Sequence, residues 1–239
     1  MDHERPRPDF SAVEAVLFDL DGTLVETTNR WAQVVAGKLS PLRRILPRLD
    51  TVRLGRQIVM SLEVPGNYAV SLAERLHLGG ALAGISDRVR RSKGLATRGS
   101  SQLIPGSLEL VQALSGHYRL AVVTTRARAE AYAFLQRAGL AGVFDAVVTR
   151  EDVLPMKPHP APVRRAAQLL GVPTARCLMV GDTTMDVCAG RRAGALTVAV
   201  LSGFGDRHEL TRSQPDLILD TVAQLRPLLP GATDVPGEN

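Results

Sequence analysis

The junction between a short apolar run and two aspartates near the N-terminus constrains this chain more than any other feature. The run from Ala15 to Phe18 ends at once in Asp19-Leu20-Asp21-Gly22-Thr23. Four apolar residues bounded by a turn signal predict a strand that is buried on both faces of a parallel sheet. The two aspartates would then follow the carboxyl end of that strand, where open α/β sheets bind their ligands. Two carboxylates so close repel each other unless a cation lies between them, which indicates a divalent ion such as Mg²⁺.

The same five residues are also typical of an acidic turn without any ligand, because Asp and Gly both favour turns. Taken alone, the segment leaves both interpretations open, and the rest of the chain has to separate them.

From residue 104 onward, short apolar runs alternate with helical patterns of about a dozen residues or fewer. This alternation is typical of parallel βαβ units with right-handed crossovers, so we predict an α/β fold with a Rossmann-like parallel sheet. The later strands are expected at 120–123, 146–148, 177–180, 196–201 and 216–219, and the helices at 107–114, 128–138, 160–170, 184–193 and 221–228.

The segment 26–101 interrupts this alternation, and we interpret it as an all-helical cap domain inserted after the first strand. It has helical stretches but few strand-like runs, with helices expected at 30–39, 52–61 and 69–76. The core domain would comprise residues 1–25 and 102–239, with disordered tails at 1–12 and 230–239.

The net charge of +5 is concentrated in the insert. Residues 26–104 contain 13 Lys and Arg against 5 Asp and Glu, whereas the remainder of the chain contains 16 against 19. A basic insert facing a more acidic core favours a small anionic partner, although a solvated basic surface without a role explains the same charges. Nucleic acid is not the partner we expect, because only 4% of the residues are aromatic and no nucleic-acid module is recognisable.

The sequence favours a cytoplasmic protein without membrane contact. No apolar stretch reaches the roughly 18 residues of a membrane span, and the first dozen residues lack the apolar run of a signal peptide. The two cysteines, Cys177 and Cys188, are interpreted as reduced, buried structural thiols.

Three later segments repeat the pattern of polar side chains placed at or near the ends of strands. Hydroxyl groups and backbone amides suit a phosphate oxygen, and a second carboxylate pair stands at a strand-to-helix turn. In chain order the segments provide Thr124 with Thr125, then Lys157, and then Gly181-Asp182 with Asp186.

Lys157 is informative because the chain contains three lysines and 26 arginines. Such a composition would be expected to place arginine at an indifferent position. A compact ammonium group suits a crowded phosphate site beside carboxylates better than a broad planar guanidinium does. The alternative is that Lys157 is a solvated loop residue.

In these four segments the sequence resembles the haloacid dehalogenase superfamily of phosphohydrolases. The resemblance covers nearly all of residues 14–228 and keeps the family's order and spacing. The Lys157 segment and two further segments are similar to the phosphoglycolate phosphatase-like branch of this superfamily. These are Ile104-Pro105-Gly106, Lys157-Pro158-His159-Pro160 and Ser202-Gly203-Phe204-Gly205. The long gap before Thr124 has room for the family's helical C1-type cap, and the short gap before Lys157 has no room for its α/β cap.

The resemblance implies a Mg²⁺-dependent phosphatase that hydrolyses a small, phosphoglycolate-like phosphate monoester through an aspartyl-phosphate. Asp19 would be the nucleophile, and Asp21 would be the general acid and base. Thr124 and Lys157 would hold the transferring phosphoryl oxygens, helped by Gly22 and the amides around Thr125. The metal would be held by a carboxylate oxygen of Asp19, the backbone carbonyl of Asp21, and Asp182. Asp186 would complete the metal site by holding a metal-bound water, or would orient Lys157.

Several alternatives stay open at this point. The aspartate at position 21 favours phosphoryl transfer over dehalogenation, because a halide leaves without needing a proton. A β-phosphoglucomutase-like phosphomutase, a pyrophosphatase, a phosphatase acting on a nucleotide end and a non-catalytic phosphate-binding module all fit the same motifs. In the cap, Arg56 is our hypothesis for a substrate contact, with a solvated arginine face as the alternative. Either a monomer or a homodimer is compatible with the sequence.

Overall fold

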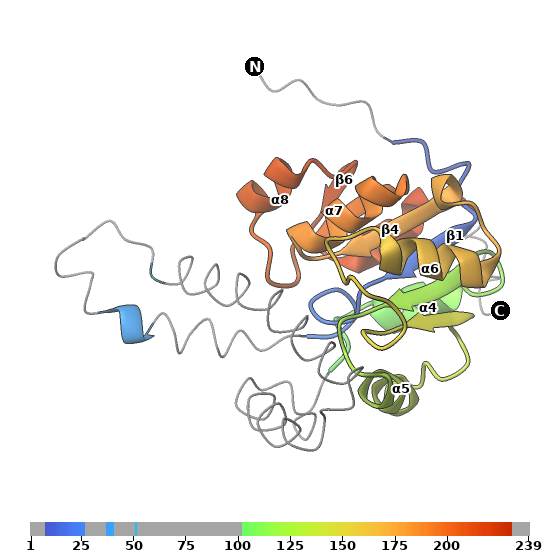
Figure 1. Cartoon of the computed structure of the whole chain (residues 1–239), viewed down its shortest axis with the longest axis horizontal. Helices are drawn as coiled ribbons and strands as arrows, with labels where there is room; N and C mark the ends of the chain where they lie inside the picture. The colour runs from blue at the N-terminus through green and yellow to red at the C-terminus, as the bar shows by residue number, and fades with distance from the viewer. Residues whose placement is uncertain (1–7, 27–36, 41–50, 52–101, 231–239) are drawn as a thin grey trace, which may run out of the picture. The chain divides into compact units, whose positions relative to one another are not determined.

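The computed structural model describes residues 8–26, 37–40, 51 and 102–230 (Figure 1). The chain divides into two compact units, one formed by residues 1–26 with 102–239 and the other by residues 27–101. The three helices predicted for the insert lie largely outside the described residues, although residues 37–39, at the end of the first, are helical. The cap assignment therefore stays a prediction, and the fold below is that of the first unit.

Six parallel strands form a single sheet in the order β3-β2-β1-β4-β5-β6. The first strand thus lies inside the sheet, and the strand order reverses beside it, which is where open α/β sheets bind ligands. The strands are β1 (Ala15–Phe18), β2 (Arg119–Val123), β3 (Ala146–Val148), β4 (Cys177–Gly181), β5 (Leu196–Val200) and β6 (Leu217–Leu219).

Helices cover both faces of this sheet (Figure 1). The helices are α4 (Ser107–Leu114), α5 (Arg128–Arg137), α6 (Ala161–Leu170), α7 (Thr184–Ala193) and α8 (Arg207–Ser213), with 3₁₀ turns η2 (Thr174–Arg176) and η3 (Val222–Leu228). Val16 and Phe18 of β1 pack in the core with α4, α5 and η3, whereas Ala15 and Leu17 pack with α6 and α7. Successive strand side chains point to opposite faces, so a strand covered on both sides is apolar at every position.

The predicted α/β fold with a parallel sheet is confirmed. Two strands and two helices have the predicted bounds, and the remaining predicted strands and α-helices differ at their ends by one residue. The prediction of an α-helix at 221–228 is wrong in type. Residues 222–228 form a 3₁₀ helix, and this helix contains Pro227, which has no backbone N–H to donate. Helix α8 was not predicted. It has seven residues, and the side chain of Asp206 caps it by accepting a hydrogen bond from the backbone of Glu209.

The ordered core extends into both predicted tails. Phe10 lies inside the stretch 1–12 but is 6% exposed and packs in the core. At the other end, the carbonyl of Pro230 accepts a hydrogen bond from the Tyr118 hydroxyl. Both cysteines are free, but Cys188 is half-buried, so the prediction of buried thiols is right only for Cys177.

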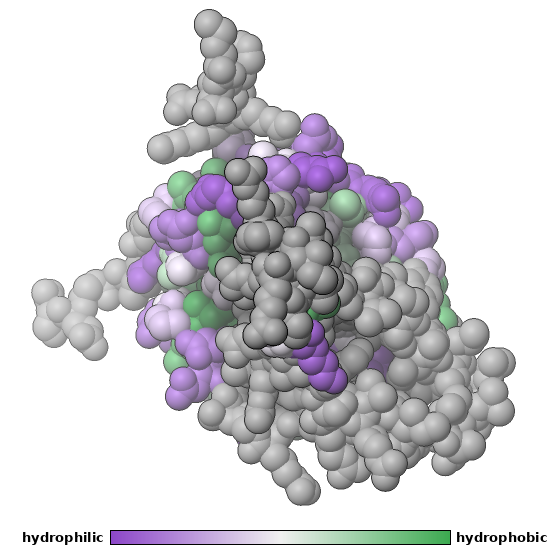
Figure 2. Space-filling view, turned by 90° about the vertical axis from the view of Figure 1, so that its left-hand side faces the viewer, coloured by the Kyte–Doolittle hydropathy of each residue, from purple (hydrophilic) through white to green (hydrophobic). Residues whose placement is uncertain are grey.

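The described surface is of mixed polarity. Figure 2 shows mainly hydrophilic residues with scattered hydrophobic ones among the coloured atoms of one face. The exposed large hydrophobic side chains in the described ranges are Tyr132 and Leu169, on α5 and α6. Of the helices that the structure describes, none has the length and apolar character needed to cross a membrane.

Candidate active site

Three neighbouring strands deliver polar residues to one edge of the sheet. Because β1 lies between β2 and β4 in parallel register, the residues that follow these strands meet at the same edge. These residues are Asp19, Thr124 and Asp182. The backbone N–H of Asp19 donates to the carbonyl of Val180 at 2.9 Å, which extends the pairing of β1 and β4 by one residue.

Lys157 joins this edge from the loop before α6. Its Nζ donates to Asp19 Oδ1 at 2.7 Å, to Asp186 Oδ1 at 2.6 Å and to the carbonyl of Val123 at 2.9 Å. An ammonium group has three N–H donors, and all three are used here. The residue is 4% exposed, so one buried lysine connects the end of β1, the end of β2 and the start of α7.

Asp186 is held at the N-terminus of α7 by a reciprocal capping box with Thr183. Its Oδ2 accepts hydrogen bonds from the Thr183 hydroxyl at 2.5 Å and from the Thr183 backbone at 3.0 Å. A Cβ on Gly181 would overlap the Asp186 carboxylate, which explains the glycine at the end of β4. Because Lys157 and Thr183 engage both oxygens, Asp186 is better placed to orient Lys157 than to serve as an open ligand.

Asp182 is completely buried, and the first motif supports it. Thr23 Oγ1 donates to its Oδ1 at 3.3 Å, and the backbone N–H of Phe204 donates to its Oδ2 at 2.7 Å. Gly22 has φ +85°, and a Cβ there would overlap the Asp182 carboxylate. Both the left-handed backbone and the close approach require glycine at this position.

The carboxylate cluster carries more negative charge than Lys157 balances. Burial raises the pKa of Asp19 to about 7, with Lys157 opposing and Asp186 and Asp21 adding to the rise. Burial and then the charges of Asp19 and Asp186 raise the pKa of Asp182 well above its usual range. Burial alone would lower the pKa of Lys157, but attraction to Asp186 and Asp19 outweighs burial and raises it.

This donor set fits a divalent cation. Ligand oxygens of Asp19, Asp182 and Asp186 all lie within 4.8 Å of one another. Mg²⁺ prefers oxygen ligands and is held by a small number of carboxylates. Two positive charges would offset the excess negative charge that raises the pKa values of this buried cluster.

Thr124 stands beside the cluster, one residue beyond the carbonyl that accepts from Lys157. It is 1% exposed, and its Oγ1 accepts a hydrogen bond from the backbone N–H of Arg126 at 3.2 Å. Since a hydroxyl has one donor as well as acceptor lone pairs, its proton is available for a ligand oxygen. Thr125 is half-buried in the turn that follows.

Asp21 does not join the other three carboxylates; it pairs with Arg126. Arg126 Nε donates to Asp21 Oδ2 at 2.7 Å, and the NH2 group contacts Oδ1. The Arg126 guanidinium also lies over the ring of Phe134, 5.3 Å from its centre. Arg126 was not among the predicted site residues. Its position two residues after Thr124 was the available signal, but one arginine does not stand out among 26.

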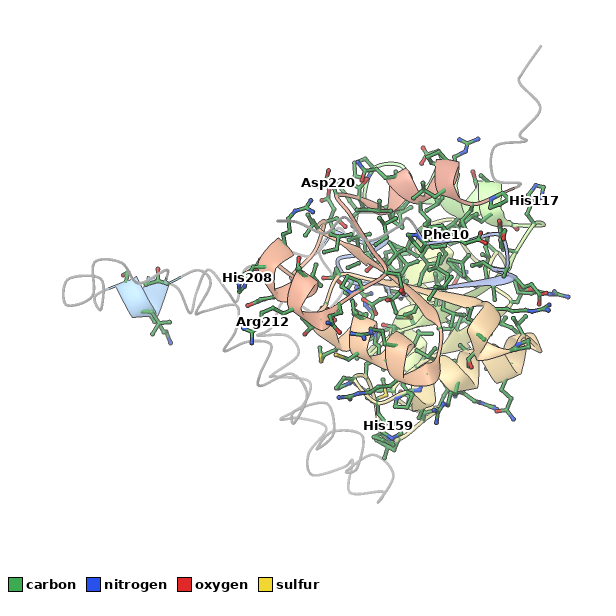
Figure 3. The ribbon with its side chains drawn as sticks, turned by 90° about the horizontal axis from the view of Figure 1, so that it is seen from above. Phe10, His117, His159, His208, Arg212 and Asp220 are labelled. Atoms are coloured by element: carbon green, nitrogen blue, oxygen red, sulfur yellow. The ribbon has the colours of Figure 1, made fainter. Side chains whose placement is uncertain are left out.

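Arg56 and His159 remain to be considered. Arg56, the hypothetical substrate contact, is outside the described residues. His159 follows Lys157 by two residues but is exposed and projects from the surface (Figure 3). Its Nδ1 accepts a hydrogen bond from the backbone of Ala161 at 3.2 Å, so it supports the start of α6.

A family model for haloacid dehalogenase-like hydrolases matches residues 16–200. The chain belongs to this family. The match runs from β1 to the end of β5 and therefore includes every segment of the candidate site. The resemblance that the motifs indicated is confirmed, and with it the hydrolase class of this haloacid dehalogenase-like protein.

Relatives of this haloacid dehalogenase-like hydrolase are named as phosphatases or pyrophosphatases. The probable phosphatase IndB of Dickeya dadantii is 32% identical over 212 residues, which cover 88% of this chain and 90% of the relative. Pyrophosphatase PpaX of Bacillus cereus is 41% identical over 122 residues, which cover 51% of this chain and 56% of the relative. The chain thus spans a little over half the length of the pyrophosphatase relatives it matches.

Solved structures show the same fold at lower identity. A predicted phosphoglycolate phosphatase from Haemophilus somnus has a TM-score of 0.63 at 22% identity, with 90% of this chain and 97% of that chain covered. A β-phosphoglucomutase from Clostridium difficile has a TM-score of 0.60 at 22% identity, with 89% and 93% covered.

Proposed function

We propose that this chain is a Mg²⁺-dependent phosphatase that hydrolyses a small phosphate monoester, phosphoglycolate-like in size and charge, through an aspartyl-phosphate. The observation that most supports this proposal is the contact of Lys157 with both Asp19 and Asp186, beside the buried Asp182. A phosphate monoester is a dianion that repels an anionic nucleophile, so its cleavage requires fixed positive charge around the phosphoryl group. The site holds a carboxylate and such a charge in contact.

The chain's own residues suit a two-step transfer. Lys157 occupies Oδ1 of Asp19, so we assign the attack on phosphorus to Oδ2. The Lys157 ammonium would neutralise the charge of the phosphoryl group, and the Thr124 hydroxyl would orient a phosphoryl oxygen by donating to it. Asp21 would give a proton to the departing alkoxide, then take one from the water that attacks the aspartyl-phosphate, which releases inorganic phosphate and restores Asp19.

We assign the Mg²⁺ ligands to Asp19, Asp182 and the backbone carbonyl of Asp21, with Asp186 acting through Lys157. When bound, Mg²⁺ would supply charge neutralisation between the nucleophile and the phosphate. The carboxylate arrangement supports this assignment, because Asp182 is fixed by Thr23 and Phe204 and has lone pairs beyond those two hydrogen bonds.

A pyrophosphatase is the second candidate, and the 41% identity with PpaX over half of the chain favours it. The same residues would then act on a phosphoanhydride, whose leaving group is itself a phosphate. A phosphomutase on this scaffold would isomerise a sugar phosphate without net release of phosphate.

Release of inorganic phosphate from an aryl phosphate, with and without Mg²⁺, tests the proposal. We expect Mg²⁺-dependent release, loss of at least about 1,000-fold in Asp19→Asn, and a phosphorylated Asp19 peptide in acid-quenched wild type. Asp220→Asn is the matched control, because Asp220 is exposed and pairs with Arg207 at 3.1 Å on the surface (Figure 3). Wild-type turnover by Asp19→Asn would refute the assignment of the nucleophile.

A further inference from the structure

The pairing of Arg126 with Asp21 has a chemical consequence for the reaction. Both carboxylate oxygens face N–H groups of one guanidinium, in the fork-to-fork geometry that gives the strong arginine–carboxylate pairs. The two side chains are 9% and 19% exposed, so water screens the pair only weakly.

In this pair both oxygens of Asp21 face the guanidinium, and among the described residues neither is turned toward another group. To bring a proton to a leaving oxygen, Asp21 would have to turn away from Arg126. The buried guanidinium would then lose the partner of its charge, which is strongly unfavourable unless another anion replaces it.

Arg126 is fixed beside Thr124, the proposed phosphate ligand, and Asp21, the proposed general acid. Its backbone donates to Thr124, the proposed phosphate ligand, and its guanidinium packs over Phe134. The NH1 group is buried and has no hydrogen-bond partner in the described part of the chain, so the guanidinium has donors beyond those that Asp21 uses. A planar fork of this kind matches a carboxylate or a phosphate.

We propose that Arg126 binds an anionic group on the leaving part of the substrate, and that Asp21 occupies Arg126 until that anion displaces it. The substrate class is then a phosphate ester or anhydride with a second anion, either a carboxylate or a phosphate, close to the bond that breaks. This inference rests on the proposed phosphatase function and adds its specificity. A neutral leaving group would free Asp21 only by breaking its pair with Arg126, which would leave the guanidinium the weaker attraction of Asp19 and Glu130.

Matched substrates test this assignment in the full chain with Mg²⁺. Phosphoglycolate is compared with its uncharged amide, and propane-1,3-diyl bisphosphate with 3-hydroxypropyl phosphate, so that the two arms separate a carboxylate from a second phosphate. We expect wild type to prefer the charged member of at least one pair by about 100-fold or more in kcat/KM. Arg126→Gln should reduce that preference to about fivefold or less by raising KM for the charged substrate.

Two further variants keep the test decisive. Arg128→Gln removes a neighbouring exposed arginine, which pairs with Asp152 at 2.5 Å, and should leave the preference unchanged. Arg126→Lys keeps the charge but loses the fork, should reduce the preference to about tenfold, and decides the matter if Arg126→Gln does not fold.

The outcomes separate the two proposals. If wild type releases phosphate but shows no preference in either pair, or if Arg126→Gln slows charged and neutral substrates equally, the role of Arg126 is refuted and the phosphatase stands. If wild type releases phosphate from none of the four substrates or the aryl phosphate, the proposed function fails and this inference fails with it.

Discussion

Replacement of Lys157 by methionine tests the electrostatics of the site directly. The substitution keeps an unbranched side chain but removes the ammonium from two carboxylates. The side chain of Lys157 is 3% exposed, and those of Asp19 and Asp186 are 10% and 1% exposed, so little of the interaction is lost to solvent. Removing one partner of such a buried pair costs about 3–5 kcal/mol. We expect the free energy of unfolding without Mg²⁺ to fall by that amount at pH 8.

The loss of stability in Lys157→Met should depend on pH, and the pKa of Asp19 determines whether it grows or shrinks as the pH rises. Its pKa in the folded protein is raised from 3.8 to about 7, so the folded state binds a proton more tightly than the unfolded state. Stability therefore decreases as the pH rises through that interval. Because Lys157 lowers the pKa of Asp19, this pKa lies higher in Lys157→Met. The variant therefore keeps losing stability up to a higher pH than wild type does. At pH 5, where Asp19 is protonated and needs no counter-charge, the deficit should be below about 2 kcal/mol.

Urea unfolding followed by circular dichroism, in EDTA at pH 5 and pH 8, measures both values. Arg119→Met is the matched control, because Arg119 is 64% exposed and pairs with Asp145 at 3.0 Å on the surface. Exposed pairs of this kind contribute about 1 kcal/mol or less, so its effect should be small at both pH values. A Lys157→Met protein that is as stable as wild type at pH 8, or equally destabilised at both pH values, would show that this account of the charges is wrong.

Three other predictions follow from the same cluster. Mg²⁺ affinity, measured by calorimetry, should weaken at least about tenfold per pH unit below pH 7, because the ion must displace protons from Asp19 and Asp182, whose pKa values are both raised; a flat profile would contradict this. Asp182→Asn should weaken Mg²⁺ binding more than Asp186→Asn, since Lys157 and Thr183 engage both Asp186 oxygens; the reverse order would exclude our ligand assignment. Gly22→Ala should cost more stability than Gly116→Ala, because both have positive φ but only Gly22 abuts Asp182; equal losses by thermal melting would leave backbone strain as the whole cause.

The sheet was predictable from sequence because its strands are short and mainly apolar runs beside turns. Parallel strands covered on both faces are apolar at nearly every position, so β1 and β3 were located to the residue. The 3₁₀ helix at 222–228 was predicted only as a helix, since the packing of Val222 and Leu225 has the same spacing in either type. Helix α8 was missed because only Leu210 in it is buried, so its sequence has no apolar stripe.

The candidate site was predictable where chemistry is tied to strand ends. Asp19, Thr124 and Asp182 each follow a strand of a parallel sheet, so the prediction of such a sheet was sufficient to place all three at its carboxyl edge. The three strands are adjacent in the structure. Lys157 was identified by its rarity, and Asp186 by its distance from Asp182 at the start of a helix. The sequence did not predict which charged side chains of the site pair with one another.

Arg126 shows why that pairing needs coordinates. Asp21 and Arg126 are 105 residues apart in the chain and each follows a different strand by a few positions, so their contact depends on the turns after β1 and β2. Motif spacing specifies where a turn begins but not which way its side chains point. The carboxylate that the family resemblance assigns as the general acid is bound, in the structure, to a guanidinium that the motif does not contain. For the role that we propose for Asp21, we infer that an anionic leaving group takes its place on Arg126, which keeps a carboxylate or phosphate paired with this guanidinium.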